Sequence, residues 1–211
     1  MANENNKVKL MGKLVQEPIL SHRVYGEGFY KTVISVERLS GACDMVPVTV
    51  SERLLLSCPA EIGGDYYITG QFRSYNNYSD TGSKLKLTVF AKTFCSADEC
   101  DEDEPNDIFL DGYLCKEPVY RSTPFGREIA DMLIAVNRSY GKSDYIPVIA
   151  WSRNARFCAS LPVGTHIRIY GRIQSREYQK KTTEGTVIKT AYEISASKLE
   201  LPDEELSEEL L

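Results

Sequence analysis

The second half of this 211-residue chain repeats the first half at an offset of about 100 residues. Identical residues recur at this spacing along most of the chain. The matched positions are Gly12 and Gly112, Glu17-Pro18 and Glu117-Pro118, Gly26 and Gly126, Val36 and Val136, Arg38 and Arg138, Asp44 and Asp144, Pro47-Val48 and Pro147-Val148, Arg53 and Arg153, Cys58 and Cys158, and, after one inserted residue, Gly70 and Gly171. A repeat that keeps its spacing predicts the same structural unit in each copy. We therefore expect two similar domains.

Each copy is predicted to contain five β-strands and one short helix. Strand-forming residues alternate between apolar and polar, and no long run with a 3.6-residue period is present. Glu17-Pro18 is expected to end the first strand, because proline cannot continue a ladder. In the first copy the predicted strands cover residues 7–14, 32–36, 45–50, 66–75 and 85–94, with a helix at 52–58 and a turn-rich loop at 76–82. This is the element order of the OB-fold, so we expect an all-β chain with two tandem OB-fold barrels.

Charge is distributed unevenly over the chain, whose net charge is −5. Residues 1–95 carry 11 basic and nine acidic side chains, and residues 108–200 carry 14 basic and nine acidic ones. Residues 96–107 and 201–211 carry seven and five acids and no base. We therefore expect a first OB-fold domain (1–95), an extended acidic linker (96–107), a second OB-fold domain (108–200) and an acidic C-terminal tail (201–211).

The sequence offers no catalytic, cofactor or metal site. The six cysteines form no CxxC pair, and His22 and His166 are not near a cysteine pair in sequence. Gly141-Lys142-Ser143 lacks the first glycine of a phosphate-binding loop. We find neither a signal peptide nor a membrane-spanning apolar run. These features predict a cytoplasmic binding protein that is not an enzyme.

The predicted strand at residues 167–178 has one apolar face and one unusual face. The apolar face carries Ile167, Ile169, Gly171 and Ile173. The other face carries Arg168, Tyr170, Arg172, Gln174, Arg176 and Tyr178, and Lys180 and Lys181 follow at the hairpin tip. A cationic face with interleaved aromatic rings and no acid suits single-stranded nucleic acid. It can equally be an ordinary solvated sheet face.

The second copy resembles the bacterial single-stranded DNA-binding protein family. Four segments carry the resemblance: Ile134–Tyr140, Tyr145–Trp151, Tyr170–Tyr178 and Tyr192–Leu199. The resemblance implies that Tyr140, Tyr145, Trp151 and Tyr178 stack on bases, although the family usually has tryptophan at three of these positions. It covers residues 108–200 and reaches residues 7–95 only through the repeat. It implies binding to single-stranded DNA in replication, recombination or repair.

The resemblance also carries expectations about partners. The family pairs barrels through their first strands and commonly assembles four of them, which implies a homodimer of this two-barrel chain. Its acidic C-terminal tail docks replication and repair proteins. The tail of this chain, residues 203–211, is acidic with an apolar end, but it lacks the usual Pro-Phe ending and a long preceding linker.

Two other functions remain compatible with the residues. The chain could be an OB-fold assembly or interaction protein that does not bind nucleic acid, although the Arg and Tyr face argues against this. It could also bind single-stranded RNA, because stacking and phosphate contacts are shared by both polymers.

The two copies are expected to differ in their affinity for nucleic acid. Met45 and Ser51 stand where the second copy has Tyr145 and Trp151. The first copy keeps Arg73 and Tyr75 as candidate nucleic-acid-binding residues. Because each stacked base contributes about 1–3 kcal/mol, this comparison predicts that the second barrel is the main binder.

Overall fold

The structure is a computed structural model that describes residues 5–79, 82–99, 106–123, 125–182 and 185–202. Its elements follow the repeat. The first copy contains β1 (Asn6–Val24), β2 (Glu27–Glu37), β3 (Cys43–Ser51), α1 (Glu52–Ser57), β4 (Asp65–Ser79), β5 (Gly82–Ser96) and the short helix η1 (Ala97–Glu99). The second contains β6 (Asn106–Leu114), β7 (Val119–Ser122), β8 (Glu128–Arg138), η2 (Ser139–Gly141), β9 (Lys142–Trp151), α2 (Ser152–Ala159), β10 (His166–Thr182) and β11 (Gly185–Glu200).

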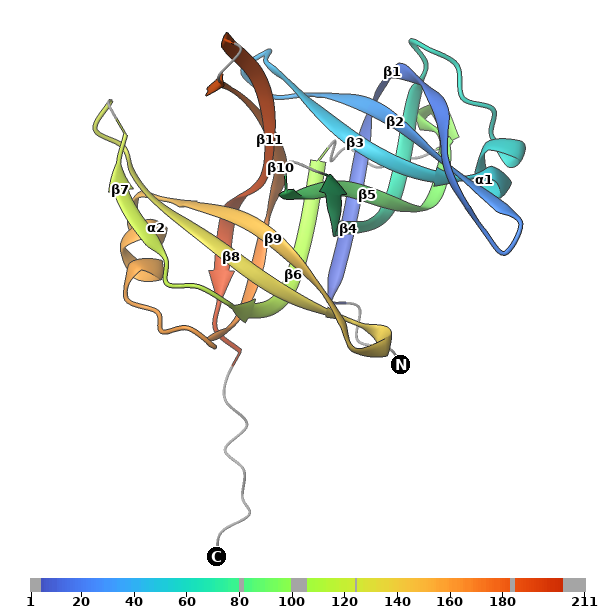
Figure 1. The fold of residues 1–211 in the computed structure, drawn as a ribbon. Helices are drawn as coiled ribbons and strands as arrows, with labels where there is room; N and C mark the ends of the chain where they lie inside the picture. The colour runs from blue at the N-terminus through green and yellow to red at the C-terminus, as the bar shows by residue number, and fades with distance from the viewer. Residues whose placement is uncertain (1–4, 80–81, 100–105, 124, 183–184, 203–211) are drawn as a thin grey trace, which may run out of the picture.

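Each copy closes into an OB-fold barrel, as the element order predicts (Figure 1). In the first barrel β1 pairs with both β2 and β4, and β3 pairs with β5 in parallel. In the second barrel β6 pairs with both β8 and β10, and β9 pairs with β11 in parallel. Because both barrels use the same pairings, the repeat in the sequence is a repeat in topology.

The two barrels share one continuous sheet. Strands β1 and β6 are antiparallel neighbours, with a register that runs from Asn6 opposite Leu110 to Leu10 opposite Asn106. The central part of the sheet therefore has the order β5-β4-β1-β6-β10-β11, and we call it the joined sheet. The family resemblance implies pairing through first strands, and here that pairing joins the two barrels of one chain.

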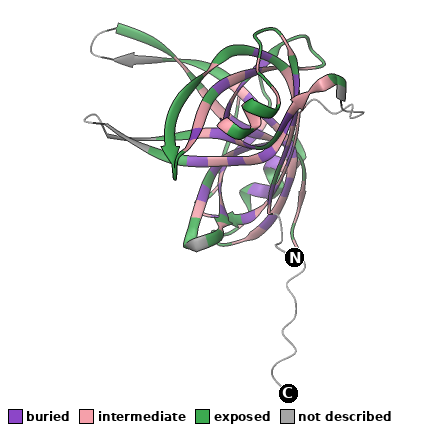
Figure 2. Cartoon of the chain, turned by 90° about the vertical axis from the view of Figure 1, so that its right-hand side faces the viewer, coloured by how far each residue is buried: buried purple, intermediate pink, exposed green. Residues whose placement is uncertain are grey.

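The barrel interiors are filled by equivalent residues. Fully buried side chains form matched pairs, and Figure 2 shows buried segments alternating with exposed ones along the barrel strands. The pairs are Leu10 and Leu110, Leu14 and Leu114, Ile34 and Ile134, Val36 and Val136, and Val46 and Ile146. Alternation places one side of each strand in the core and leaves the other side for contacts.

Gly70 and Gly171 occupy a position that admits no side chain. Each lies at a register shift, where β4 meets β5 and where β10 meets β11. A Cβ atom there would collide with the carbonyl oxygen of Phe90 or of Ser195 on the neighbouring strand. The matching glycines in the sequence therefore mark a β-bulge that each barrel needs.

Three predicted boundaries are wrong. Strand β1 continues past Pro18 to Val24, because a register shift between Gln16 and Ile19 removes the proline from the regular ladder. The predicted loop at 76–82 is largely strand, since β4 reaches Ser79 and β5 starts at Gly82. Strand β6 begins at Asn106, inside the expected linker, and its Asn106 side chain bonds both backbone groups of Ile173.

Two equivalent polar clusters connect the barrels at their boundary. Asp44 Oδ1 accepts a hydrogen bond from the Ser175 amide at 2.7 Å, and Asp44 Oδ2 accepts one from Arg38 Nε at 2.7 Å. In the matching cluster Asp144 Oδ1 accepts from the Ser74 amide at 2.6 Å, and Arg138 Nε lies 3.0 Å from Asp144 Oδ2. In both clusters an aspartate of one barrel accepts a hydrogen bond from a backbone amide of the other barrel, on β10 for Asp44 and on β4 for Asp144.

The two helices are short, six residues in α1 and eight in α2. Within the described residues, neither these nor any other helix is long and apolar enough to cross a membrane. The same residues contain no cluster of three histidine, cysteine, aspartate or glutamate side chains able to hold a metal ion.

Candidate nucleic-acid interface

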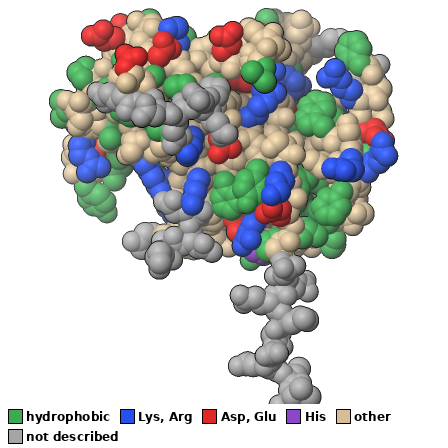
Figure 3. Space-filling view, turned by 180° about the vertical axis from the view of Figure 1, so that it is seen from behind, with side chains coloured by type: hydrophobic (Ala, Val, Ile, Leu, Met, Phe, Trp, Pro, Cys, Tyr) green, Lys and Arg blue, Asp and Glu red, His purple; other side chains and the backbone are tan. Residues whose placement is uncertain are grey.

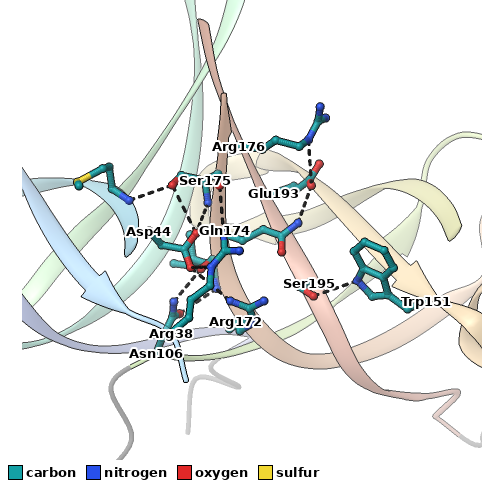
Figure 4. Close-up of polar contacts among 12 residues, drawn as sticks. Arg38, Asp44, Asn106, Trp151, Arg172, Gln174, Ser175, Arg176, Glu193 and Ser195 are labelled. Atoms are coloured by element: carbon teal, nitrogen blue, oxygen red, sulfur yellow. Dashed lines mark hydrogen bonds and ion pairs between the residues drawn. The ribbon is translucent and has the colours of Figure 1, made fainter. Parts of the chain in front are cut away.

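Strand β9 carries the two aromatic residues expected on the third strand of the second barrel. Tyr145 is about half exposed, and its backbone amide donates to Ser74 Oγ of the first barrel at 2.7 Å. Trp151 ends the strand, and its indole Nε1–H donates to Ser195 Oγ of β11 at 3.1 Å (Figure 4). The hydrogen bond fixes the orientation of the indole, and the ring is only partly buried. The hydrogen bond of Tyr145 thus fixes its backbone, that of Trp151 fixes its ring, and neither ring is fully buried.

The N-terminal part of β10 belongs to the outer face of the joined sheet. Arg168 Nε donates to Asp111 Oδ2 at 3.0 Å, and His166 Nε2 contacts Asp111 Oδ1. The Tyr170 ring lies 5.1 Å from the ring of Phe109 on β6. These contacts direct Arg168 toward β6 and place Tyr170 between β6 and β11, where its hydroxyl donates to Glu200 Oε2 at 3.3 Å.

The basic residues of β10 do not form the uncompensated cationic face that the strand alone predicts. Arg168 faces Asp111, Arg172 Nη1 lies 3.3 Å from Asp44 Oδ2, and Arg176 Nε lies 3.8 Å from Glu193 Oε1 (Figure 4). The strand itself carries no acid at these positions, as expected, but each carboxylate comes from another strand. Ion pairing therefore leaves Arg176, which has the longest of these distances and a side chain 55% exposed, as the most available cation of the three.

Gln174 is the one residue of this face that is buried, and its expected exposure is wrong. Its Nε2 donates to Glu193 Oε1 at 2.7 Å. The buried Glu193 needs this partner, because an unpaired carboxylate in a barrel wall would be costly. Gln174 therefore stabilises the buried Glu193 and is not exposed to solvent.

The remaining expected residues fall into two groups. Tyr178 on β10 and Tyr75 on β4 are both about 39% exposed. The side chains of Tyr140, Lys180 and Lys181 lie outside the described part of the structure.

A groove of about 700 Å³ runs between the two barrels. Three tyrosines and two lysines give it its chemistry, and two equivalent prolines lie in its wall. These residues are Tyr75, Tyr178, Tyr192, Lys31, Lys86, Pro47 and Pro147. The groove thus brings Tyr75 and Tyr178, from opposite barrels, to one surface. Aromatic rings with flanking lysines can bind a single strand by stacking and phosphate contacts.

The first barrel contains an aromatic group that the sequence analysis missed. The rings of His22 and Phe29 stack at 5.2 Å, and the rings of Phe29 and Phe90 lie 5.6 Å apart. The Arg73 guanidinium carbon lies 4.2 Å from the centre of the Phe90 ring. Comparing the two copies residue by residue did not reveal this group, because its members are not at the positions equivalent to Tyr145 and Trp151. A search for aromatic residues across neighbouring strands would have found it.

Burial changes the ionisation of two groups at the barrel boundary. Burial, followed by the nearby positive charge of Arg138, lowers the pKa of Arg73 below its usual value. Burial also raises the pKa of Asp144, against the opposing effects of the Ser74 amide and the Arg138 charge. The negative charge of Asp144 opposes both effects on Arg73.

The second barrel matches a known family. Residues 105–202 match the single-strand binding protein family. Single-stranded DNA-binding protein A of Bacillus subtilis is 34% identical over 83 residues, which cover 36% of this chain and 48% of the relative. The single-stranded DNA-binding protein of Caldanaerobacter subterraneus is 34% identical over 80 residues, which cover 35% of this chain and 53% of the relative. The chain thus spans about half the length of the curated relatives it matches.

A solved structure shares the fold over the whole chain. The crystal structure of a deletion mutant of the single-stranded DNA binding protein from Thermus aquaticus matches with a TM-score of 0.73 and 21% identity, and covers 100% of both chains. The wild-type protein from Thermus aquaticus matches with a TM-score of 0.69 over 93% of this chain and 92% of its own. At this level of identity the similarity establishes the two-barrel fold.

Proposed function

We propose that this chain binds single-stranded DNA without sequence specificity, because residues 105–202, which form the second barrel, match the single-strand binding protein family. The observation that carries the proposal is the pair of partly exposed aromatic rings on β9, Tyr145 and Trp151, on a barrel that matches that family. Base stacking on such rings tolerates any sequence, because every base has a π-face. The role is binding, with no chemical step.

The proposed path of the strand starts on β9 and continues through the groove between the barrels. Tyr178 and Tyr75 provide stacking surfaces there, and Arg176 and Lys86 provide positive charge. Tyr140, Lys180 and Lys181 belong to the proposal through the family resemblance alone. Arg168 faces Asp111 on β6, Tyr170 contacts both β6 and β11, and Arg172 faces Asp44, so we assign these three to structure and assembly.

We infer that two copies of the chain associate through the outer face of the joined sheet. Since β1 and β6 already pair within the chain, first-strand pairing is not available to a second copy. The outer face carries two aromatic pairs, Phe109 with Tyr170 and Tyr113 with His166. The charged side chains beside them are paired within the chain, as Arg168 is with Asp111. Figure 3 shows a side of the molecule where hydrophobic side chains lie among basic and acidic ones. Such a surface can pack against a copy of itself without leaving unpaired charge.

The acidic tail is proposed to bind replication, recombination or repair proteins. Residues 203–211 contain five acids and end in two leucines. A short acidic segment with an apolar end suits a partner that offers basic residues around an apolar pocket. Deletion of the tail should remove such partners while leaving DNA affinity unchanged or slightly raised.

Direct binding measurements test the main proposal. Fluorescence anisotropy with labelled dT, rU and duplex oligonucleotides of equal length should show the tightest binding to dT. Equal affinity for duplex would contradict recognition by stacking, because duplex bases are not accessible to the rings. Tighter binding to rU would reassign the chain to single-stranded RNA. Absence of binding to every oligonucleotide would leave an assembly protein.

A further inference from the structure

A second candidate site lies in the first barrel, beside the groove. It is a pocket of about 330 Å³, within the size range of small-ligand pockets. Its chemistry comes from aromatic rings, basic side chains and hydroxyls. The residues that supply these groups are His22, Phe90, Tyr75, Lys31, Arg73 and Arg138. Lys31 and Tyr75 also line the groove, so the pocket and the groove are continuous.

The pocket has excess positive charge. Its lining includes three cations and no carboxylate. Arg138 is paired with Asp144 behind the pocket, but neither Lys31 nor Arg73 forms an ion pair with any residue that the structure describes. Lys31 Nζ lies 5.3 Å from the centre of the Tyr75 ring, and Arg73 packs on the Phe90 ring. Arg73 also donates to Gln71 Oε1 at 2.9 Å, and the charge of Asp144 acts on Arg73 without forming an ion pair with it. Two cations that pack on aromatic rings and form no ion pair of their own in the described part of the chain suit a bound anion.

The aromatic wall of this pocket replaces the one on β9. Ser51 occupies the position of Trp151, because Ser51 pairs with Phe29 on β2 and Trp151 pairs with the equivalent Ile129 on β8. Phe90 occupies the position of Ser195, because the bulge glycines Gly70 and Gly171 meet these two residues. In the second barrel the large residue, Trp151, is on β9 and the small one, Ser195, is on β11. In the first barrel the small residue, Ser51, is on β3 and the large one, Phe90, is on β5. An aromatic ring is therefore kept in this region of each barrel, on β9 in the second and on β5 in the first.

The second barrel lacks cations at the two equivalent positions. Lys31 pairs with Thr49, and Asp131 pairs with the corresponding Ile149. Arg73 lies opposite Thr88 on β5, whereas Gln174 lies opposite Glu193 on β11. The first barrel thus has a lysine and an arginine where the second has an aspartate and a glutamine. A cationic pocket is therefore a property of the first barrel alone.

We propose that the first-barrel pocket binds one nucleotide of the single strand, with the base against the aromatic wall and the phosphate between Arg73 and Lys31. The inference rests on the proposed binding of single-stranded DNA and adds a second site of different construction. It adds a binding role for the first barrel to the expectation that the second barrel is the main binder. The strand would pass from Trp151 through the groove and into the pocket.

The test uses the full chain and Arg73→Gln, which introduces the residue that the second barrel has at this position. Binding of a dT oligonucleotide long enough to cover both barrels is measured by anisotropy. Loss of one charge-assisted phosphate contact should weaken binding about tenfold or more and reduce the log–log salt slope by about 0.7. Trp151, the only tryptophan, reports on the second barrel. Its quenching by a dT oligomer of about eight nucleotides, roughly one barrel's site, should be unchanged in the variant.

Controls keep the result interpretable. Arg53→Gln changes an exposed arginine on α1 that does not line the pocket, and it should bind as the wild type does. If Arg73→Gln does not fold, as judged by its circular dichroism melt, the exposed Lys31→Gln takes its place with the same expected loss. Wild-type affinity in both pocket variants would overturn the inference and leave the proposed function intact. A wild-type chain that binds no dT would overturn both.

Discussion

The backbone amide of Ser74 donates to Asp144 Oδ1 at 2.6 Å, and this bond links β4 of the first barrel to β9 of the second. The bond from Ser175 to Asp44, at 2.7 Å, is its counterpart in the opposite direction. Both carboxylates are almost completely buried. The relative placement of the two barrels, and hence the shape of the groove between them, depends on these two bonds together with the pairing of β1 and β6.

Asp44→Asn should destabilise the protein. The substitution removes a charge that Arg38 and Arg172 both face, and leaves those guanidinium groups without a carboxylate. We expect a loss of about 2–3 kcal/mol in the free energy of unfolding, less than for a fully buried pair because both arginines are partly exposed. Urea denaturation measures it. Asp65→Asn, in the exposed pair with Lys13, is the matched control and should cost under about 0.5 kcal/mol.

Asp144 should make stability depend on pH. Since burial raises its pKa, protonation favours the folded state. This contribution is fully present below the ordinary pKa of aspartate and is lost as the pH rises through the raised pKa. The free energy of unfolding of the wild type, compared with Asp144→Asn, should therefore fall as the pH rises through that interval. Carboxyl NMR gives the pKa directly, and a value at or below the ordinary one would contradict the prediction.

Arg176→Gln should reduce the salt dependence of DNA binding, whereas Arg168→Gln should not. Arg176 is exposed and only loosely paired with Glu193, while Arg168 donates to Asp111 on the outer face of the joined sheet. Loss of one phosphate contact changes the log–log slope by about 0.7 for a single strand. The slope is measured by anisotropy over a series of salt concentrations. Equal slopes in both variants would remove Arg176 from the proposed path.

Trp151→Ala should weaken dT binding by about 1–3 kcal/mol, the range for one stacked base. Ser195→Ala removes only the hydroxyl that accepts the indole hydrogen bond, so it should have a smaller effect. In the wild type the fluorescence of Trp151 should be quenched on binding. Unchanged fluorescence with saturating DNA would place the strand elsewhere on the barrel.

Phe109→Glu should dissociate the proposed dimer. Phe109 packs on Tyr170 in the outer face of the joined sheet, and a carboxylate there would lie close to Asp111. Light scattering should give the mass of one chain for this variant and of two chains for the wild type. Phe125→Glu, at the highly exposed turn before β8, is the control and should remain dimeric. A wild type that is monomeric at micromolar concentration would end the dimer proposal.

The sequence predicted the fold well because the repeat is carried by core and turn residues. Leu10 and Leu110, or Gly70 and Gly171, recur since each barrel needs the same side chain or the same absence of one. The pairing of β1 with β6 was not predicted within the chain. It uses backbone groups, which every residue has, and so leaves no pattern in the side chains.

The candidate site was predicted less completely. Alternation along β10 correctly identified the outward arginines, but it could not show that Asp111, Asp44 and Glu193 come from other strands to meet them. The contact of Phe29 with Phe90 was missed for a related reason. It depends on which residues lie side by side across three strands, and register shifts in β1 and at Gly70 change that alignment.

The antiparallel pairing of β1 with β6 relates the barrels by an approximate twofold axis, although they belong to one chain. Two identical chains paired in this way would offer a strand the same site twice, in opposite orientations. With both barrels encoded in one chain, the two sites need not be copies of each other. Lys31 stands where the second barrel has Asp131, and Ser51 stands where it has Trp151. The twofold relation therefore holds for the matched core residues of the barrels but not for these positions.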